Sequence, residues 1–447
     1  MRFGKGENLF DNIMKILILL LFFIFSIGLP VSGVPNQKNP SETVSSALQW
    51  TDILAAAKQN NSTLIKTKKS LEIANNNYYA AISNFLPQIT ASASAGRSGS
   101  DSSSASNDYS YGISGRLSLF SGFSDYSVLK IKNIELKIAK TEYDRVLSDM
   151  IYNLKRYFDD LLWAQEMVRL SEQILNRRIE NYNLVSLKYE AGREDKGSLL
   201  RLDADKYQAE TDLFQARRRV LSSSAQLSKE IGKNDFTVLI VTGSLTVEKN
   251  SALIETDYVK RKELFFGRLL NEIPEYINAE YSLKKAVLSV KSAKSEFYPS
   301  LTLSAGDSKR GDHWAPSNNS WNIGLSLSYP LFAGGKNKRN VNTAGLNREI
   351  AEESLREMRS MLFVKYETAA NDLSNSLENL KVREKYLFAS EEQSRVTTTK
   401  YINGLATYQD WYSVENDLIN AQKSLLNAHK EYLLSEEYLK NILGYSE

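Results

Sequence analysis

Two stretches of the chain alternate between apolar and polar residues with a period of two. The apolar positions of the first are Ile89, Ala91, Ala93, Ala95, Tyr111, Ile113, Leu117 and Leu119, and those of the second are Leu301, Leu303, Ala305, Ile323, Leu325, Leu327 and Tyr329. Strict alternation places one set of side chains on each face of a strand. Each stretch therefore predicts a β-hairpin, at about residues 86–120 and 298–332, with one apolar and one polar face.

Such a hairpin suits either a half-buried sheet in a soluble domain or a membrane, with lipid on one side and a wet lumen on the other. Membrane strands need about 9–11 residues and aromatic side chains at both interfaces. These runs have that length, and aromatic residues stand at both ends: Tyr109, Tyr111 and Trp321 near the loops, and Phe85, Phe120, Phe297, Tyr298, Tyr329 and Phe332 opposite. The loops expected at 97–108 and 307–319 are polar. The pattern favours the membrane, with Ser114, Arg116 and Ser326 facing the lumen, where Arg116 either tunes selectivity or pairs with a carboxylate.

A second pattern has a period of seven. Between Ser124 and Ala191 the chain contains neither Gly nor Pro, and an apolar or aromatic residue recurs every seventh position: Leu147, Leu154, Leu161, Val168, Leu175, Tyr182 and Tyr189. A sustained seven-residue repeat keeps one stripe of a helix against a partner helix. At about 1.5 Å per residue the run predicts a coiled-coil helix on the order of 100 Å long.

The chain repeats itself at an offset of 212 residues. Matching pairs are Pro87 and Pro299, Gly122 and Gly334, Gly192 and Gly404, and Gly232 and Gly444. One position departs from the stripe, because Ser394 stands opposite Tyr182. The repeat predicts one unit written twice, at 47–232 and 271–444, with helix breaks near 192–197 and 404. The descending arms are expected at about 198–231 and 405–443.

Three other segments complete the organisation. Residues 1–33 have the charged, apolar and small-residue regions of a secretory signal peptide, with an uncleaved anchor as the minor alternative. Residues 34–46 predict a flexible lead, and a helical pattern at 48–84 runs into the first hairpin. The segment 233–270 has no counterpart; its runs 238–241 and 245–247 could form short strands on the flank of the helices. Residues 445–447 form a tail.

Composition narrows the function. The 56 basic and 53 acidic residues nearly balance, which gives no indication of a nucleic-acid partner. The absence of Cys excludes disulfides, thiol chemistry and a lipid-modified N-terminal Cys. His313 and His429 have no second ligand at metal spacing, and no catalytic triad, phosphate-binding loop or dinucleotide motif is present. We therefore expect no enzyme activity, no cofactor and no metal site.

Four membrane strands cannot close a barrel. Unpaired strand edges facing lipid cost several kcal/mol per backbone group, and the smallest familiar barrels have eight strands. Two chains would supply eight strands and three would supply twelve, with room for a channel. The hairpins therefore predict an oligomer, without its number of subunits.

The two repeats of helix, hairpin and helix, with Pro-opened strands, Leu-Phe-x-Gly exits and Tyr-x-x-Gly helix breaks, resemble the TolC-like outer-membrane factors, the outer membrane efflux protein family. The resemblance covers about residues 47–444, and the order and constant offset of the motifs are its specific part. It implies a mainly α-helical fold with a membrane β-barrel part: a homotrimer with a shared twelve-stranded barrel in outer-membrane lipid and an α-helical tunnel in the periplasm. It also implies a passive gated conduit for efflux or type I secretion. An inner-membrane pump would drive transport through a periplasmic adaptor.

The resemblance assigns roles to particular residues. Tyr401 matches a gate tyrosine, Asp410 matches the first carboxylate of a constriction ring, and Ser413 stands at the second ring position. The helix breaks would be tips that dock the adaptor, formed by Gly192, Arg193, Asp195, Gly197, Gly404 and Leu405. Each role has a structural alternative, namely coiled-coil packing for Tyr401, an exposed helix charge for Asp410 and a solvated turn for the first tip. For the whole chain, the alternative is a soluble periplasmic coiled-coil scaffold.

Overall fold

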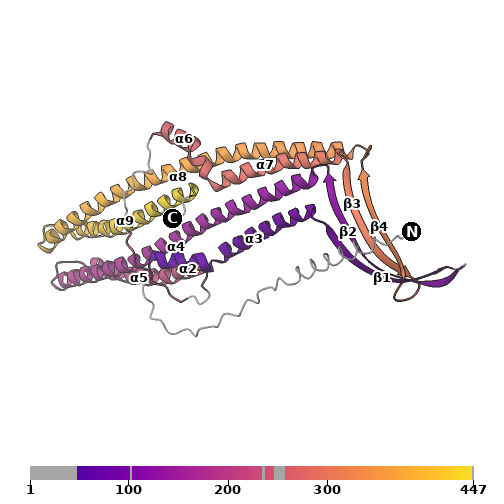
Figure 1. The fold of residues 1–447 in the computed structure, drawn as a ribbon. Helices are drawn as coiled ribbons and strands as arrows, with labels where there is room; N and C mark the ends of the chain where they lie inside the picture. Colours follow the sequence, from indigo (N-terminus) through magenta and orange to yellow (C-terminus); the bar gives the residue numbers. More distant parts are fainter. Residues whose placement is uncertain (1–47, 101–102, 234–236, 246–256, 445–447) are drawn as a thin grey trace, which may run out of the picture. The chain divides into compact units, whose positions relative to one another are not determined.

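The computed structural model describes residues 48–100, 103–233, 237–245 and 257–444, and the chain from Ala47 onward forms one compact unit. The predicted signal peptide, the flexible lead and the tail lie outside the described residues. Within this unit, four strands form one antiparallel sheet, and long helices form the remainder (Figure 1).

The sheet joins the two repeats. Its strands, in the order β1-β2-β3-β4, are β1 (Gln88–Ser100), β2 (Ser103–Ser121), β3 (Ser300–Gly311) and β4 (Asn318–Ser328). The predicted hairpins are β1–β2 and β3–β4, and β2 pairs with β3 across the repeats. Strands β1 and β4 are the edges and have no partner on their outer side within the described chain.

The hairpins are longer than the sequence predicted. Arg97 pairs with Asn107 and Ser98 with Ser106, so most of the loop expected at 97–108 is strand. The second loop is shorter than expected as well, because β3 ends at Gly311 and β4 begins at Asn318. Polar side chains do not interrupt pairing, since the backbone groups form the ladder.

The apolar and polar faces continue across all four strands. Opposed residues in an antiparallel sheet share a face, and Leu303 lies opposite both Leu117 and Leu325. The register shifts between Ser118 and Phe120, so Phe120 and not Leu119 lies opposite Leu301. Leu119 was therefore wrongly placed in the apolar series. On β4, Ile323, Leu325 and Leu327 are 68%, 63% and 68% exposed, so much of the apolar face is uncovered within the described part of the chain.

Two helices of 67 residues each, α4 (Ser124–Glu190) and α8 (Lys336–Ile402), follow the hairpins. Each returns through a shorter helix: α5 (Lys196–Ile231) packs on α4, and α9 (Tyr408–Ile442) packs on α8 and α4. Nearer the sheet, α3 (Ser62–Ile82) packs on α4, and α7 (Pro274–Lys294) lies between α4 and α8 (Figure 1). No helix in the described ranges combines the length and apolar character needed to cross a bilayer.

The helix expected at 48–84 is two helices, α2 (Trp50–Asn60) and α3. Asn61 separates them because its side chain caps α3, accepting hydrogen bonds from the backbone N–H groups of Thr63 and Leu64 at 2.9 and 3.0 Å. Its amide also donates to the carbonyl of Glu230 at 2.7 Å, which ties the break to α5.

The seven-residue stripe forms the core between helices. Leu154 and Leu161 of α4 are fully buried, and Tyr366, Leu373 and Leu380 are buried on α8. On α4 the burial of the stripe weakens toward the end of the helix, where Tyr189 is exposed, whereas on α8 the stripe is buried as far as Tyr401 in the last turn. The stripe therefore faces other helices along most of its length, as a coiled-coil seam predicts.

Residues 237–245 of the segment between the repeats pack on α4 and α5, whereas Phe265, later in the segment, stacks on Tyr366 of α8. Leu239 and Val241 are buried against α4 and α5, and Gln165 exchanges two hydrogen bonds with the backbone of Val241. The predicted strands at 238–241 and 245 are wrong, since the described part contains only one isolated bridge, between Leu48 and Val241. Residues 246–247 lie outside the described residues. The sequence did not predict α6 (Tyr258–Gly267) or the turns η3 (Leu269–Glu272), η1 (Ser83–Phe85) and η4 (Ser295–Phe297).

Candidate functional site

Helices α4 and α5 form one helical hairpin and helices α8 and α9 form another, and the tip of each begins with the same helix stop. Gly192 and Gly404 have φ values of +67° and +75°, in the left-handed region that favours glycine. The following residues, Arg193 and Leu405, donate backbone hydrogen bonds to Lys188 and Lys400 at 2.8 Å, which completes a Schellman motif. No atom lies within 4 Å of a Cβ added at either glycine, so backbone conformation alone requires Gly there.

The first tip then restarts with a capped helix. Asp195 caps α5 by accepting hydrogen bonds from the N–H and hydroxyl of Ser198 at 2.9 and 2.8 Å, and these bonds lower the pKa of its carboxyl. Gly197 lies close to this cap, because an added Cβ would come within 2.9 Å of the Asp195 carboxylate. Arg193 is exposed, and Leu405 of the second tip is 77% exposed. A solvated turn fits Asp195 and Gly197, and docking by these tips stays a prediction.

Tyr401 joins the two tips. Its ring is buried and stacks on Trp411 of α9 at 4.6 Å between centroids. Its hydroxyl donates to Glu194 of the other tip at 2.8 Å, while Lys188 of α4 donates to its carbonyl at 2.6 Å. Burial, together with the acceptor Glu194, raises the pKa of Tyr401, so the phenol stays a neutral donor.

Asp410 and Ser413, in contrast, are exposed and lie one turn apart on α9. Asp410 belongs to the helix cap: the Thr407 hydroxyl donates to its carboxylate at 2.6 Å, and its backbone N–H donates to the same hydroxyl at 3.1 Å. The contacts within one chain thus give Asp410 a capping role. A ring role for both residues stays a prediction.

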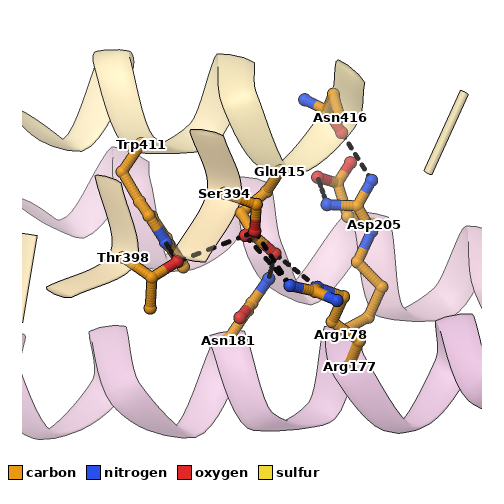
Figure 2. A network of polar contacts seen from close by, with 9 residues as sticks. All are labelled: Arg177, Arg178, Asn181, Asp205, Ser394, Thr398, Trp411, Glu415 and Asn416. Carbon is orange, nitrogen blue, oxygen red and sulfur yellow. Dashed lines mark hydrogen bonds and ion pairs between the residues drawn. The ribbon is translucent and has the colours of Figure 1, made fainter. Parts of the chain in front are cut away.

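Glu415 of α9 is a buried carboxylate that the sequence did not single out (Figure 2). Arg177 of α4 donates to it at 2.7 Å, Asn181 of α4 at 3.1 Å, and Ser394 of α8 at 2.5 Å. Three helices from both repeats therefore converge on one charge. Burial alone would raise the pKa of Glu415, but these hydrogen bonds outweigh it and lower the pKa.

The network extends in two directions (Figure 2). Thr398 donates to Glu415 at 3.3 Å and accepts a hydrogen bond from the indole of Trp411 at 3.1 Å. Since Trp411 stacks on Tyr401, polar and aromatic contacts are continuous from Glu194 to Arg177. On the other side, Arg178 donates to Asn416 at 2.5 Å and lies 3.6 Å from Asp205 of α5.

One sequence signal did point to this network. Ser394 interrupts the apolar stripe of α8, and the structure shows the reason, because its hydroxyl is fully engaged by Glu415 and Arg177. Arg177 and Glu415 themselves lie among many helical charges. No periodicity separates them from exposed pairs such as Arg395 and Glu392.

The predicted lumen residues share one face of the sheet. Arg116 lies opposite Ser304, Ser114 opposite Gly306 and Ser326 opposite Thr302, and the side chains of all three are exposed. In the described part of the chain Arg116 makes no ion pair, whereas Arg310 on the same face pairs with Asp108 at 2.8 Å. The lumen assignment stays a prediction.

Within the described ranges, no group of three or more His, Asp or Glu residues is arranged to hold a metal ion. His313 lies exposed beside Asp312, with its Nδ1 2.7 Å from the carboxylate. His429 is half-buried on α9, where burial lowers its pKa.

The sequence matches the family "Outer membrane efflux protein" over residues 53–233 and 267–445. The chain belongs to this family. It is 23% identical to the outer membrane protein TolC of Vibrio cholerae over 431 residues, which cover 90% of this chain and 92% of the relative. It is 22% identical to the probable outer membrane lipoprotein SilC of Salmonella typhimurium over 419 residues, covering 89% and 86% of the two chains. The solved structure of the outer membrane protein VceC of Vibrio cholerae superposes with a TM-score of 0.77 at 19% identity, covering 88% of this chain and 95% of that one.

Membership of the outer membrane efflux protein family confirms three predictions. The chain is a TolC-like outer-membrane factor, its fold combines long coiled-coil helices with a four-stranded share of a barrel, and it is an outer-membrane protein. The family is one of channel proteins and not of enzymes.

Proposed function

We propose that the chain assembles as a homotrimer into a gated, passive outer-membrane conduit for export. One observation carries this proposal: a sheet with a bare apolar face and two unpaired edges is joined directly to two 67-residue helices. An apolar sheet face suits lipid, and unpaired edges in lipid require strands from further copies. Three copies supply twelve strands, enough to surround a lumen.

The long helices would continue the lumen as a tunnel toward the tips. The contacts of Tyr401 with Glu194 and of Glu415 with Arg177 hold the helical hairpin α8–α9 against α4–α5. Both contacts must break before these hairpins can separate. This supports a gate near the tips that is closed in the described conformation, with Asp410 and Ser413 on the exposed face that three copies would turn toward one another.

The tips are the proposed docking points for a periplasmic adaptor, which would connect the conduit to an inner-membrane pump. Leu405 and Arg193, each following a glycine stop, support this assignment because their side chains are exposed within the described part of the chain. Transport energy would come from the pump.

The test is planar-bilayer conductance combined with mass measurement of the detergent-solubilised protein. We expect a trimeric mass and discrete channels of low conductance. We also expect higher conductance when Tyr401→Phe and Arg177→Ala are combined. The Tyr401–Glu194 and Glu415–Arg177 contacts between the two helical hairpins are then both lost. A protein that is monomeric and dissolves without detergent would contradict the proposal and favour the scaffold alternative.

A further inference from the structure

Three hydrogen-bond donors stand side by side on the apolar face of the sheet. Lys309 of β3 lies opposite Tyr111 of β2 on one side and opposite Asn319 of β4 on the other. Directly opposed residues of an antiparallel sheet share a face, with Cβ atoms about 4.5–5.5 Å apart. This set of three, the Lys309 row, therefore presents a phenol hydroxyl, an ammonium group and an amide within reach of one small ligand.

The Lys309 row stands where the apolar face of the sheet ends. Lys309 is six residues after Leu303 on β3, and every second side chain of a strand lies on the same face. Between them on this face come Ala305 and then Asp307, which lies opposite Trp321 of β4. The face thus changes from apolar, through a mixed row with an indole, to the three donors.

This place is the end of the sheet that lies away from the helices. Lys309 is two residues before the end of β3 at Gly311, and Asn319 is the second residue of β4. The connection between these strands lies at this end, whereas the helices join the sheet at the other (Figure 1). With the helices in the periplasm, as the proposed conduit requires, the Lys309 row meets the outer leaflet of the membrane. Tyr and Trp side chains beside it suit the headgroup level.

The donors of the Lys309 row are available to a ligand. Tyr111 is 40% exposed, Lys309 and Asn319 are exposed, and the three side chains form no hydrogen bond or ion pair within the described residues. The next residue of β3 differs, because the Arg310 guanidinium on the polar face donates hydrogen bonds of 2.9 and 2.8 Å to Asp108. Of these two adjacent cations, the one on the polar face is paired and the one on the apolar face is not.

We propose that the Lys309 row binds the phosphate of an anionic lipid in the outer leaflet. Phosphate oxygens accept hydrogen bonds from all three donors, and a lysine ammonium binds phosphate as a point charge. Lys309 supplies the charge, Tyr111 and Asn319 orient the phosphate, and the acyl chains of the lipid run along the apolar rows. The inference rests on the proposed conduit, because it requires the apolar face to meet lipid, and it adds a specific ligand at the outer rim.

Asp307 sets the sign of a second effect. It stands two residues before Lys309 on the same face, about 6.6 Å along the strand. In the described part of the chain the two side chains form no ion pair, so the carboxylate does not occupy the Lys309 ammonium. A phosphate bound at the Lys309 row is repelled by this carboxylate, and removing the charge of Asp307 should therefore strengthen binding.

The test measures how tightly phosphatidylglycerol, whose headgroup carries one anionic phosphate, binds to the detergent-solubilised oligomer, with native mass spectrometry counting the bound lipids. Lys309→Gln should weaken binding about five-fold, the effect of one basic residue near an anionic membrane surface. Lys309→Arg should retain it. Arg310→Gln is the matched control, since it removes the neighbouring cation on the opposite face, and should bind as the natural protein does. Equal losses for Lys309→Gln and Arg310→Gln would overturn the proposal.

Asp307→Asn provides a readout in the opposite direction. This variant should bind phosphatidylglycerol more tightly than the natural protein, because a like charge next to the phosphate is gone. Binding that is unchanged or weaker would show that the phosphate does not lie at the Lys309 row.

Two further probes identify the ligand chemistry. Phosphatidylcholine, whose phosphate is neutralised by an ammonium in the same headgroup, should bind more weakly and should lose little in Lys309→Gln. Inorganic phosphate at the same concentration should not displace phosphatidylglycerol, because the acyl chains add to the affinity of the lipid. Equal sensitivity of both lipids to Lys309→Gln, or displacement by inorganic phosphate, would overturn recognition of an anionic lipid.

The outcomes separate the lipid site from the conduit. Each variant is first checked for a heat-modifiable oligomer on gels, so that a loss of binding is not a loss of folding. If the oligomer requires detergent and its affinity for phosphatidylglycerol does not respond to Lys309→Gln, the lipid site is overturned while the conduit proposal stands. If the natural protein is monomeric and dissolves without detergent, both fail.

Discussion

Glu415 shows how one residue can couple two distant parts of the chain. A buried carboxylate is costly unless charge and hydrogen bonds compensate it, and here the compensation comes from α4 and α8 together. The hairpins α4–α5 and α8–α9 therefore share a charge that neither can release without exposing it. The network therefore holds the two helical hairpins together near their tips.

Removing the Arg177 cation should weaken the contact between the two helical hairpins. We expect Arg177→Ala to destabilise the protein by about 2 kcal/mol, toward the lower end for a buried pair because Arg177 itself is partly exposed. Thermal unfolding in detergent measures this. Arg177→Ala with Glu415→Gln should recover much of the loss, and Arg395→Ala, which breaks an exposed pair with Glu392, should change little. Equal losses for Arg177→Ala and Arg395→Ala would contradict the assignment.

Asp159 should make stability depend on pH. Burial raises the pKa of its carboxyl from 3.8 to about 6, outweighing the ion pair with Lys155 at 3.0 Å, and the charges of Glu437 and Asp160 add to the rise. A carboxyl whose folded pKa is raised stabilises the fold below the unfolded pKa, and this contribution is lost as pH rises through the folded value.

Asp159→Asn should therefore gain stability relative to the natural protein as pH rises from about 4 to 7, by up to about 3 kcal/mol. Thermal melts of the two proteins across this range provide the comparison. A constant difference between the two melting curves would show that Asp159 titrates normally.

At the level of elements, the effect of a substitution in the sheet depends on the face on which the side chain lies. Leu325 and Ser326 are neighbours on β4 with opposite orientations, one in the apolar row and one opposite Thr302. Their environments in the proposed barrel are lipid and lumen.

Leu325→Arg should block membrane assembly, since a cation on the lipid face costs about 2–4 kcal/mol near the bilayer centre. Ser326→Arg is the matched control and should assemble, because the lumen is wet. Fractionation into outer membranes and heat-modifiability on gels measure both variants, and the reverse order of effects would mean that the two faces are exchanged.

A glycine at a helix stop and a glycine inside a helix allow backbone strain to be distinguished from steric crowding. Gly404 and Gly345 both have open space where a Cβ would stand, but only Gly404 has a positive φ. Gly404→Ala should destabilise by about 1–2 kcal/mol, whereas Gly345→Ala inside α8 should stabilise by about 0.5–1 kcal/mol. Melting temperatures should therefore shift in opposite directions, and a common direction would contradict the role of backbone conformation at Gly404.

At the level of the whole molecule, the edge strands β1 and β4 of the proposed barrel need partner strands from neighbouring chains. Ser114 of β2 lies opposite Gly306 of β3 at the junction between the repeats. The same relation, applied between chains, places Ser326 of one protomer opposite Ser94 of the next.

Ser94→Cys with Ser326→Cys should therefore form disulfides between chains, while Ser92→Cys with Ser326→Cys, displaced by two residues along the strand, should form few. Denaturing gels under oxidising conditions compare the two. A preference for the displaced pair would mean that the barrel closes in a different register from the internal one.

The sequence alone determined the local structure of this protein. Alternation located four strands, a seven-residue stripe located two helices, and the offset of 212 residues related them, because periodicity and helix-breaking residues act over short distances along the chain. Only the tertiary structure decided which charges are buried. Glu415 and Arg177 lie 238 positions apart, and their pairing depends on how α9 docks against α4. Ser394 was visible as a gap in the stripe, but its partners required the fold. The bulge at Leu119 was likewise decided by the pairing of β2 with β3, which no local pattern records.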